Sequence, residues 1–244
     1  MLLIETVAGG HRNLEAIAAA SKLPRSTAHR ILSALVARRY LRHDPGDGYR
    51  LGPVLIELGF AAQSQLQVAV VARPHMERLA LESSETVHLG VRDGTSVVYI
   101  AKVPGTRGLT MASTVGSRAP LQTTALGKAL VAGLPEREWA SYFDAGARRR
   151  PNGIADEASF VAALARCVEL GYAEDREENE AGVRCIGVPI RDATGAVVAA
   201  LSVSGATIYI TDDRVEEIVP TILASSAAIS AELGWRARAT LDGG

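Results

Sequence analysis

Residues 14–40, LEAIAAASKLPRSTAHRILSALVARRY, have the pattern of two helices joined by a tight turn. The first helix is expected over residues 14–20. The second is expected to open near Pro24, because the fixed φ of proline suits a first helical position. Along this second helix the apolar residues recur at the spacing of one buried stripe, at Ala28, Ile31, Leu32, Leu35 and Val36. The pattern therefore predicts a helix-turn-helix.

The outward face of the second helix carries groups that hydrogen-bond to phosphate oxygens and base edges. They are Arg25, Ser26, Thr27, His29 and Arg30. A helix-turn-helix enters the major groove of DNA with the N-terminal residues of its second helix. A solvated surface helix has a similar polar face, so the helix alone leaves both interpretations open.

The next segment, YLRHDPGDGYRL at residues 40–51, favours the DNA-binding interpretation. Its turn residues, 44–48, are those of a tight hairpin. Leu41, Tyr49 and Leu51 are expected to face inward, with Arg42 and Arg50 facing outward. A two-stranded ribbon after a recognition helix is a wing. We therefore expect a winged helix-turn-helix over residues 1–52, with double-stranded DNA as its partner.

The charge distribution agrees with DNA binding by one end of the chain. Residues 1–52 hold eight Lys or Arg and four Asp or Glu, a surplus of four positive charges, whereas the chain of 244 residues has a net charge of −1, which leaves −5 for the rest. Only the part that meets phosphates needs a positive field. The length also favours two domains over one.

Several classes of protein find no support in the sequence. No apolar run approaches the ~20 residues of a membrane span, and no charged leader precedes the first apolar residues, so we expect a cytoplasmic protein. The cysteines form no CxxC pattern, the five histidines are scattered, and Gly127-Lys128 lacks the phosphate-loop spacing. No GxSxG elbow is present. We therefore expect no membrane contact, metal, cofactor or enzymatic activity, and we expect the acidic run at 174–180 to be a solvated connection.

Residues 53–72 are expected to form a linker helix and a subunit contact. Glu57 is the only charged residue between Pro53 and Val71, and an apolar helix outside a core is more often an interface than a spacer. Pro74 is expected to restart or kink a helix at the beginning of the second domain, residues 73–244.

The second domain mixes period-two and period-3.6 segments, as an α+β domain with one antiparallel sheet does. The expected strands are residues 86–92, 96–103, 109–113, 183–190 and 196–204. The expected helices are residues 123–132, 135–143, 156–170 and 212–233.

The last two strands present one face of small and polar side chains. If Arg191 faces Ala196, Cys185 lies opposite Ser202, and Cys185, Gly187, Ala200, Ser202 and Ser204 share one face. Ile186, Val188, Ile190, Val197, Leu201 and Val203 share the other, which is the expected core face. The small face leaves a volume for a ligand, for a closely packed helix, or for solvent.

These segments resemble the IclR family of bacterial transcription regulators. The resemblance rests on STAHRIL in the second helix, GYRLG in the wing, PLQTTALGKAL, ALSVSG, and above all GYAEDREENEAGVRCIGVPI at residues 171–190. That last run matches the family signature at Gly171, Asp175, Glu178 and Cys185. It departs at Arg191, where the family has an aromatic residue or histidine.

The resemblance implies a GAF-like (profilin-like) effector domain that binds a small organic acid and controls DNA binding. It places the ligand contacts at Ala125, Leu126, Asp175, Cys185, Ser202 and Ser204, with Val183 lining the pocket. It also implies a dimer or tetramer on an inverted-repeat operator, as a repressor or an activator. Unpaired N–H groups near residues 124–127, at a helix start, would favour the carboxylate. The alternative is a metabolite-binding protein or enzyme that uses its helix-turn-helix for protein contacts.

Overall fold

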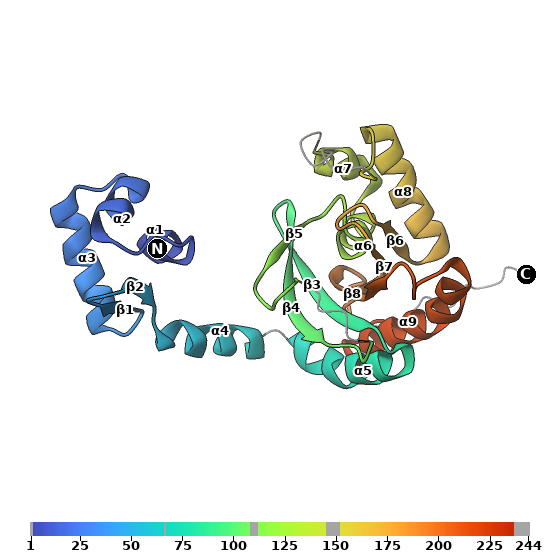
Figure 1. Cartoon of the computed structure of the whole chain (residues 1–244). Coiled ribbons are helices and arrows are strands. Elements are labelled where there is room, and N and C mark those ends of the chain that lie inside the picture. The colour runs from blue at the N-terminus through green and yellow to red at the C-terminus, as the bar shows by residue number, and fades with distance from the viewer. Residues whose placement is uncertain (1, 66, 108–111, 145–151, 237–244) are drawn as a thin grey trace, which may run out of the picture. The chain divides into compact units, whose positions relative to one another are not determined.

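The computed structural model describes residues 2–65, 67–107, 112–144 and 152–236 (Figure 1). The chain divides into two compact units, residues 1–66 and 67–244. Each unit has its own core. No helix in the described ranges is long and apolar enough to cross a membrane.

The first unit is a winged helix-turn-helix, as predicted. Its two-stranded antiparallel ribbon pairs Arg42 with Arg50. Buried side chains from every element except the last helix form its core, including Ile17, Leu32 and Leu41. The elements are α1 Leu2–Ala8, α2 Leu14–Ser21, α3 Arg25–Ala37, β1 Leu41–Asp44, β2 Gly48–Leu51 and α4 Pro53–Gln65.

Two details of this unit differ from the sequence interpretation. Pro24 is the N-cap of α3, with ψ 138°, so the helix begins one residue later than expected. Leu51 was expected to face inward but is 46% exposed, because it lies at the outer end of β2, beyond the buried Tyr49. The ribbon is held in the core by Leu41 and Tyr49.

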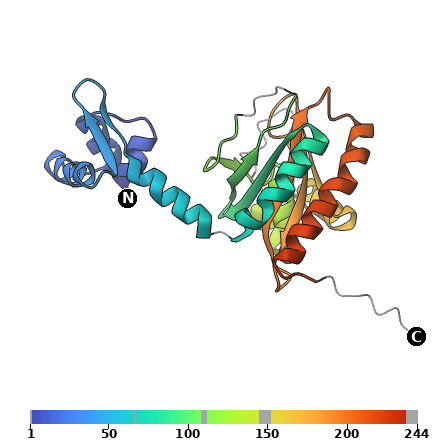
Figure 2. The same cartoon turned by 90° about the horizontal axis from the view of Figure 1, so that it is seen from below.

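The second unit is an α+β domain with one six-stranded antiparallel sheet, also as predicted. The strand order is β5-β4-β3-β8-β7-β6. Helices α5 and α9 lie side by side on one face of the sheet (Figure 2), and α6 and α8 cover part of the other. The elements are α5 Gln67–Ser83, β3 Thr86–Asp93, β4 Ser96–Val103, β5 Arg118–Pro120, α6 Ala125–Ala132, α7 Glu136–Trp139, η1 Ala140–Tyr142, α8 Glu157–Leu170, β6 Ala173–Arg176, β7 Val183–Arg191, β8 Val197–Ala206 and α9 Asp212–Glu232.

Several expected boundaries are wrong. The strand expected at 109–113 falls largely outside the described residues, and Ala112 and Ser113 are not in a strand. The helix expected at 135–143 is two short pieces, α7 and η1. Strands β5 and β6 were not expected, and β6 includes Glu174 and Asp175, so the acidic run is not simply a solvated connection.

The hairpin of β7 and β8 has a register two residues away from the expected one. Cys185 pairs with Ser204, not with Ser202. Arg191 pairs with Val197 instead of Ala196, and the register shifts by one more residue between Ile190 and Arg191. A shift of two residues preserves the alternation of faces, so the expected small face is retained. Val197 is the exception, because beyond the shift it packs against α6 and α8 and not against the core under α5 and α9.

Candidate functional site

The first unit presents two groups of exposed basic side chains. Arg25, His29 and Arg30 are exposed on α3, and Arg42 and Arg50 on the ribbon. The interior of α3 is packed through Ala28 and Leu32. The other two residues predicted to contact DNA are Ser26, which is exposed, and Thr27, which is half-buried.

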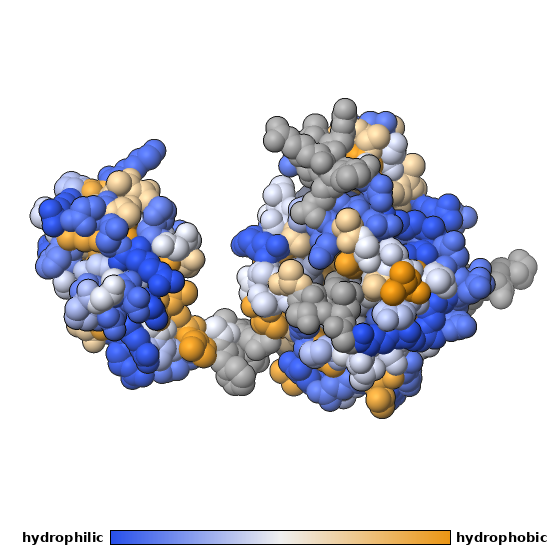
Figure 3. Space-filling view, viewed as in Figure 1, coloured by the Kyte–Doolittle hydropathy of each residue, from blue (hydrophilic) through white to orange (hydrophobic). Residues whose placement is uncertain are grey.

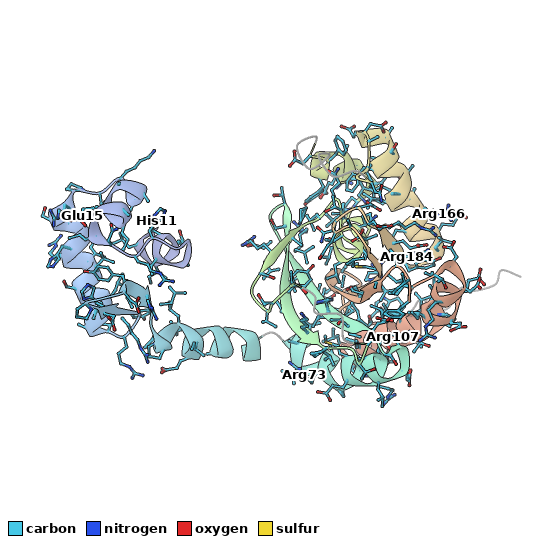
Figure 4. The ribbon with its side chains drawn as sticks, viewed as in Figure 1. His11, Glu15, Arg73, Arg107, Arg166 and Arg184 are labelled. Atoms are coloured by element: carbon cyan, nitrogen blue, oxygen red, sulfur yellow. The ribbon has the colours of Figure 1, made fainter. Side chains whose placement is uncertain are left out.

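Ion pairs involve some of these arginines and not others. Arg25 lies 2.8 Å from the Glu15 carboxylate of α2, with both side chains exposed, and Glu15 is labelled in Figure 4. Arg50 pairs with Asp47 in the turn. Within the described residues, Arg30 and Arg42 have no ion pair. Exposed pairs are weak, so each of these arginines can contact phosphate or a base.

Apolar side chains also reach the surface of this unit. Ile56 and Leu58 on α4 are 77% and 49% exposed. Orange surface is visible along α4 in Figure 3, beside the blue surface of the ribbon and the adjoining helices.

The second unit contains a cavity of about 400 Å³. Its wall is formed by the start of α6, by the sheet from β6 across to β3, and by the segment that leads into β5. All seven residues expected to bind or enclose an effector line this one cavity. They are Ala125, Leu126, Asp175, Val183, Cys185, Ser202 and Ser204.

The start of α6 closes one side of the cavity. Thr124 caps the helix, and its hydroxyl accepts the N–H of Gly127 at 3.0 Å. The helix approaches the sheet at Gly187, where a Cβ would lie 2.5 Å from the backbone of Ala125. The expectation that residues 124–127 all offer free N–H groups is thus too broad. Gly127 is already capped, and Ala125 and Leu126 are the residues that precede the first intrahelical donor.

Asp175 is the most buried carboxyl in the cavity wall, at 1% exposure. Its Oδ1 accepts the N–H groups of Glu178 and Asn179, at 2.8 and 3.2 Å. Burial raises the pKa of Asp175 to about 7, although the nearby Lys128 ammonium opposes the shift. Lys128 is itself buried and pairs with Glu178 at 2.6 Å. Near neutral pH the Asp175 carboxyl can therefore exist in either protonation state.

Along β6 and β7, the side chains that alternate with Asp175 and Cys185 lie on the other face of the sheet, toward α9. Arg184 lies 2.8 Å from Glu174 and 2.7 Å from Asp212 at the start of α9, and it is labelled in Figure 4. These ion pairs connect the two strands to the helix. Side-chain alternation then directs Asp175 and Cys185 into the cavity.

Sequence reasoning did not identify seven further polar residues of the cavity lining as site residues. They are His88, Tyr99, Ser113, Ser117, Arg118, Asn179 and Glu180. His88 could have been identified, because the period-two pattern of residues 86–92 puts Val87, Leu89 and Val91 on the core face and His88 on the other. Ser113, Arg118 and Asn179 come from segments whose sequences have no such periodic pattern.

Two observations bear on metal binding and nucleophilic chemistry at the site. No group of three or more His, Cys, Asp or Glu in the described part of the chain could hold a metal ion. Burial, together with the Asp175 carboxylate, raises the pKa of the Cys185 thiol. A thiol with a raised pKa is a poor nucleophile near neutral pH.

The family models that match the chain agree with this two-part architecture. Residues 1–45 match the IclR helix-turn-helix domain, and residues 60–231 match the model described as "Bacterial transcriptional regulator IclR C-terminal". The HTH-type transcriptional regulator XynR of Escherichia coli (strain K12) is 34% identical over 218 residues, which are 88% of this chain and 86% of XynR.

Solved structures show the same fold. A putative transcriptional regulator from Rhodococcus sp. RHA1 has a TM-score of 0.84 and 31% identity, covering 95% of this chain and 94% of that one. An IclR homologue from Microbacterium hydrocarbonoxydans, solved in complex with 4-hydroxybenzoate, has a TM-score of 0.82 and 26% identity over 95% and 96% of the two chains. The fold, the matched models and the identity to XynR together show that this chain belongs to the IclR family, the bacterial transcription regulators with a DNA-binding helix-turn-helix and an effector-binding C-terminal domain.

Proposed function

We propose that this regulator responds to a small organic acid, which binds in the cavity of the second unit. The observation that carries the proposal is that all seven residues implied by the family resemblance line one cavity of about 400 Å³, a size suited to a small molecule. The N–H groups of Ala125 and Leu126 would bind the carboxylate. Leu126 and Val183 would limit the size of the ligand.

The bound acid in the structure from Microbacterium hydrocarbonoxydans supports this class of effector. In this chain Asp175 would bind a hydroxyl group or a water molecule, because a second carboxylate beside its ionised form would be repelled.

We further propose that α3 reads the operator and that the ribbon contacts its backbone. The α3 residues are Arg25, Ser26, Thr27, His29 and Arg30, and those of the ribbon are Arg42 and Arg50. All of them except the half-buried Thr27 are exposed. The regulator would bind an inverted-repeat operator as a dimer or a dimer of dimers, and it would act in the cytoplasm, where chromosomal DNA is accessible.

A thermal-shift screen of small carboxylic acids tests the effector proposal. An acid at a hundredfold excess over its Kd should add ~2.7 kcal/mol to the free energy of unfolding. The most stabilising acid should also change the affinity for DNA from upstream of the protein's own gene. The double substitution Ser202→Ala, Ser204→Ala should remove the stabilisation. Unchanged acid affinity in that variant would show that the acid binds elsewhere.

The alternative is a metabolite-binding protein or an enzyme whose helix-turn-helix contacts proteins. Turnover of a bound acid, or DNA affinity that does not depend on salt, would favour this alternative and contradict the regulator described above.

A further inference from the structure

His88 is a buried residue of the cavity wall for which acid binding alone gives no role. It is 2% exposed on β3 and lines the cavity. Its Nε2 lies 2.7 Å from the Ser113 hydroxyl, on the segment leading to β5, and its Nδ1 lies 3.4 Å from the Ser204 hydroxyl on β8. The ring therefore joins the sheet to the segment that leads into β5, which lines the cavity.

The two ring nitrogens are not equally engaged. A distance of 2.7 Å is a short, well-formed hydrogen bond, whereas 3.4 Å is at the outer limit. The Ser113 side is also fixed from behind, because Lys102 Nζ donates to the Ser113 carbonyl at 2.7 Å. Nδ1 is thus the nitrogen that a ligand can engage, together with the Ser204 hydroxyl.

The imidazole is neutral near physiological pH. Burial lowers the pKa of His88 to about 3, and the Lys102 ammonium contributes to the shift. A neutral ring offers one donor and one acceptor and no positive charge. It is therefore suited to a hydroxyl group and gives little added attraction for a carboxylate.

The groups beside His88 have the same character. Ser202 is its direct partner across the sheet, and Ser204 faces Cys185, which faces Asp175. These side chains, from β6 to β3, offer hydrogen bonds and no cation. An alkyl or aromatic surface against them would leave buried polar groups unpaired, which costs free energy.

We infer that His88 is a specificity-determining residue of the cavity, and that it selects organic acids carrying a hydroxyl group, which binds between His88 Nδ1 and Ser204. The inference rests on the proposed function, since the carboxylate end of the same molecule is bound by the start of α6. It narrows the effector class from acids in general to hydroxy acids.

Acids that differ only in hydroxyl groups test the inference. The probes are pentanoate with 5-hydroxypentanoate, hexanoate with gluconate, and benzoate with 4-hydroxybenzoate. Calorimetry on the full-length protein should give a tighter Kd for the hydroxy acid in at least one pair. His88→Leu removes the hydroxyl contact and should weaken binding of that hydroxy acid by about tenfold, the equivalent of one hydrogen bond. The affinity for the plain acid of the same pair should remain nearly unchanged.

Two polar variants separate ligand recognition from support of the fold. His88→Asn keeps a polar group near the position of Nδ1 and should retain part of the hydroxyl preference. His88→Gln reaches instead toward Ser113 and should lose the preference. If His88→Leu does not fold, the comparison of the Asn and Gln variants still tests the inference. His75→Leu, in which the histidine pairs with Glu232 on α9 away from the cavity, is the matched control and should behave as wild type.

The contrary outcomes are distinct. Plain acids that bind and change DNA affinity as strongly as their hydroxy partners would overturn the role of His88 and leave the acid effector standing. Equal losses for both members of a pair in His88→Leu would reduce His88 to a structural residue. Absence of binding by any acid, with DNA binding intact, would overturn both the inference and the acid-effector proposal.

Discussion

Burial of Asp175 should make the stability of the protein depend on pH near neutrality. Burial raises its pKa to about 7, well above the ordinary range of an aspartate. The charged groups around it are Lys128 on α6 and Glu178 in the connection after β6. Between pH 4 and 7 the folded state holds a proton that the unfolded state has released, so stability falls as pH rises through this window.

We predict that Asp175→Asn removes this loss of stability. Its amide oxygen can still accept the N–H groups of Glu178 and Asn179. The free energy of unfolding of the variant, relative to wild type, should therefore be higher at pH 8 than at pH 5. Urea denaturation at both pH values measures it. Asp192→Asn is the control, because hydrogen bonds from Thr194 lower the pKa of Asp192 and should leave no change in this window. A constant difference between Asp175→Asn and wild type would contradict the shift.

The same carboxyl should make acid binding depend on pH. An anionic ligand is repelled by ionised Asp175 and can hydrogen-bond to the protonated form. We predict that the affinity for the acid found in the screen rises as pH falls from 8 to 6, and that Asp175→Asn weakens this dependence. Calorimetry at matched ionic strength measures both. Equal affinity at both pH values in wild type would argue against contact between the acid and Asp175.

Gly187 permits the close approach of α6 to the sheet. A Cβ at this position would lie 2.5 Å from backbone atoms of Ala125, which can move only with the helix. We predict that Gly187→Ala lowers the free energy of unfolding by about 1–3 kcal/mol, as other overpacking changes do, and weakens acid binding. Denaturation followed by tryptophan fluorescence reports on this unit, because Trp139 and Trp235 both lie in it.

Gly9→Ala is the control for this prediction, and its unfolding is followed by circular dichroism because the first unit contains no tryptophan. A Cβ there meets backbone atoms only at 3.5 Å, an ordinary contact. An equally stable Gly187→Ala protein with unchanged acid affinity would mean that α6 can move away from the sheet without cost.

At the scale of elements, long periodic segments were predictable and short ones were not. Helices α3, α5 and α9 and strands β3, β4, β7 and β8 bury a continuous stripe or face, so their patterns are visible in the sequence. Strands β5 and β6 are three and four residues long and lie at the two edges of the sheet. They form because a neighbouring strand offers backbone hydrogen bonds. The pattern of apolar residues within such a short segment does not indicate this pairing.

In the hairpin of β7 and β8 the sequence predicted which face each side chain occupies, but it did not predict the cross-strand pairs. Alternation assigned Cys185, Ser202 and Ser204 to one face, and all three line the cavity. The pairing was wrong because it assumed that Arg191 faces Ala196 in a regular ladder, whereas Arg191 pairs with Val197 and the register shifts again between Ile190 and Arg191. A shift of two residues leaves each side chain on the same face of the sheet but changes its partner on the neighbouring strand. This is why the cavity lining was predictable while the position of Val197 was not.

Two elements of the first unit should contribute differently to DNA binding. Arg25 is the first residue of α3, where helix-turn-helix proteins read base edges. Arg42 lies on β1 of the wing, which we expect to contact the phosphate backbone of the DNA. We predict that Arg25→Ala costs about 1–3 kcal/mol on the operator and relaxes specificity, whereas Arg42→Ala weakens all sequences alike and lowers the salt slope by about 1.

Fluorescence anisotropy on operator and random DNA, at several salt concentrations, measures both effects. Arg166→Ala is the control, because Arg166 is an exposed arginine on α8 in the other unit (Figure 4). Identical salt slopes and specificities for the Arg25 and Arg42 variants would contradict the division of roles between helix and wing.

At the scale of the whole molecule, we propose that α4 is a subunit contact and so connects DNA binding to the state of assembly. Ile56 and Leu58 are both exposed on this helix, and large apolar side chains exposed outside a core are candidates for a subunit contact. Glu57, between them, is held by Arg39 at 3.3 Å. In a symmetric dimer these apolar side chains would meet their equivalents, and two recognition helices would face the two halves of an inverted repeat.

We predict that Ile56→Glu with Leu58→Glu shifts the protein toward monomers in sedimentation experiments. Affinity for the full inverted repeat should fall by about 10² or more, because two linked half-site contacts become independent. Affinity for an isolated half-site should remain unchanged, since α3 and the wing are untouched. Val168→Glu, at an exposed apolar position on α8, should leave assembly and DNA binding as in wild type. A double variant that still sediments as wild type and binds the full operator normally would place the subunit contact outside α4.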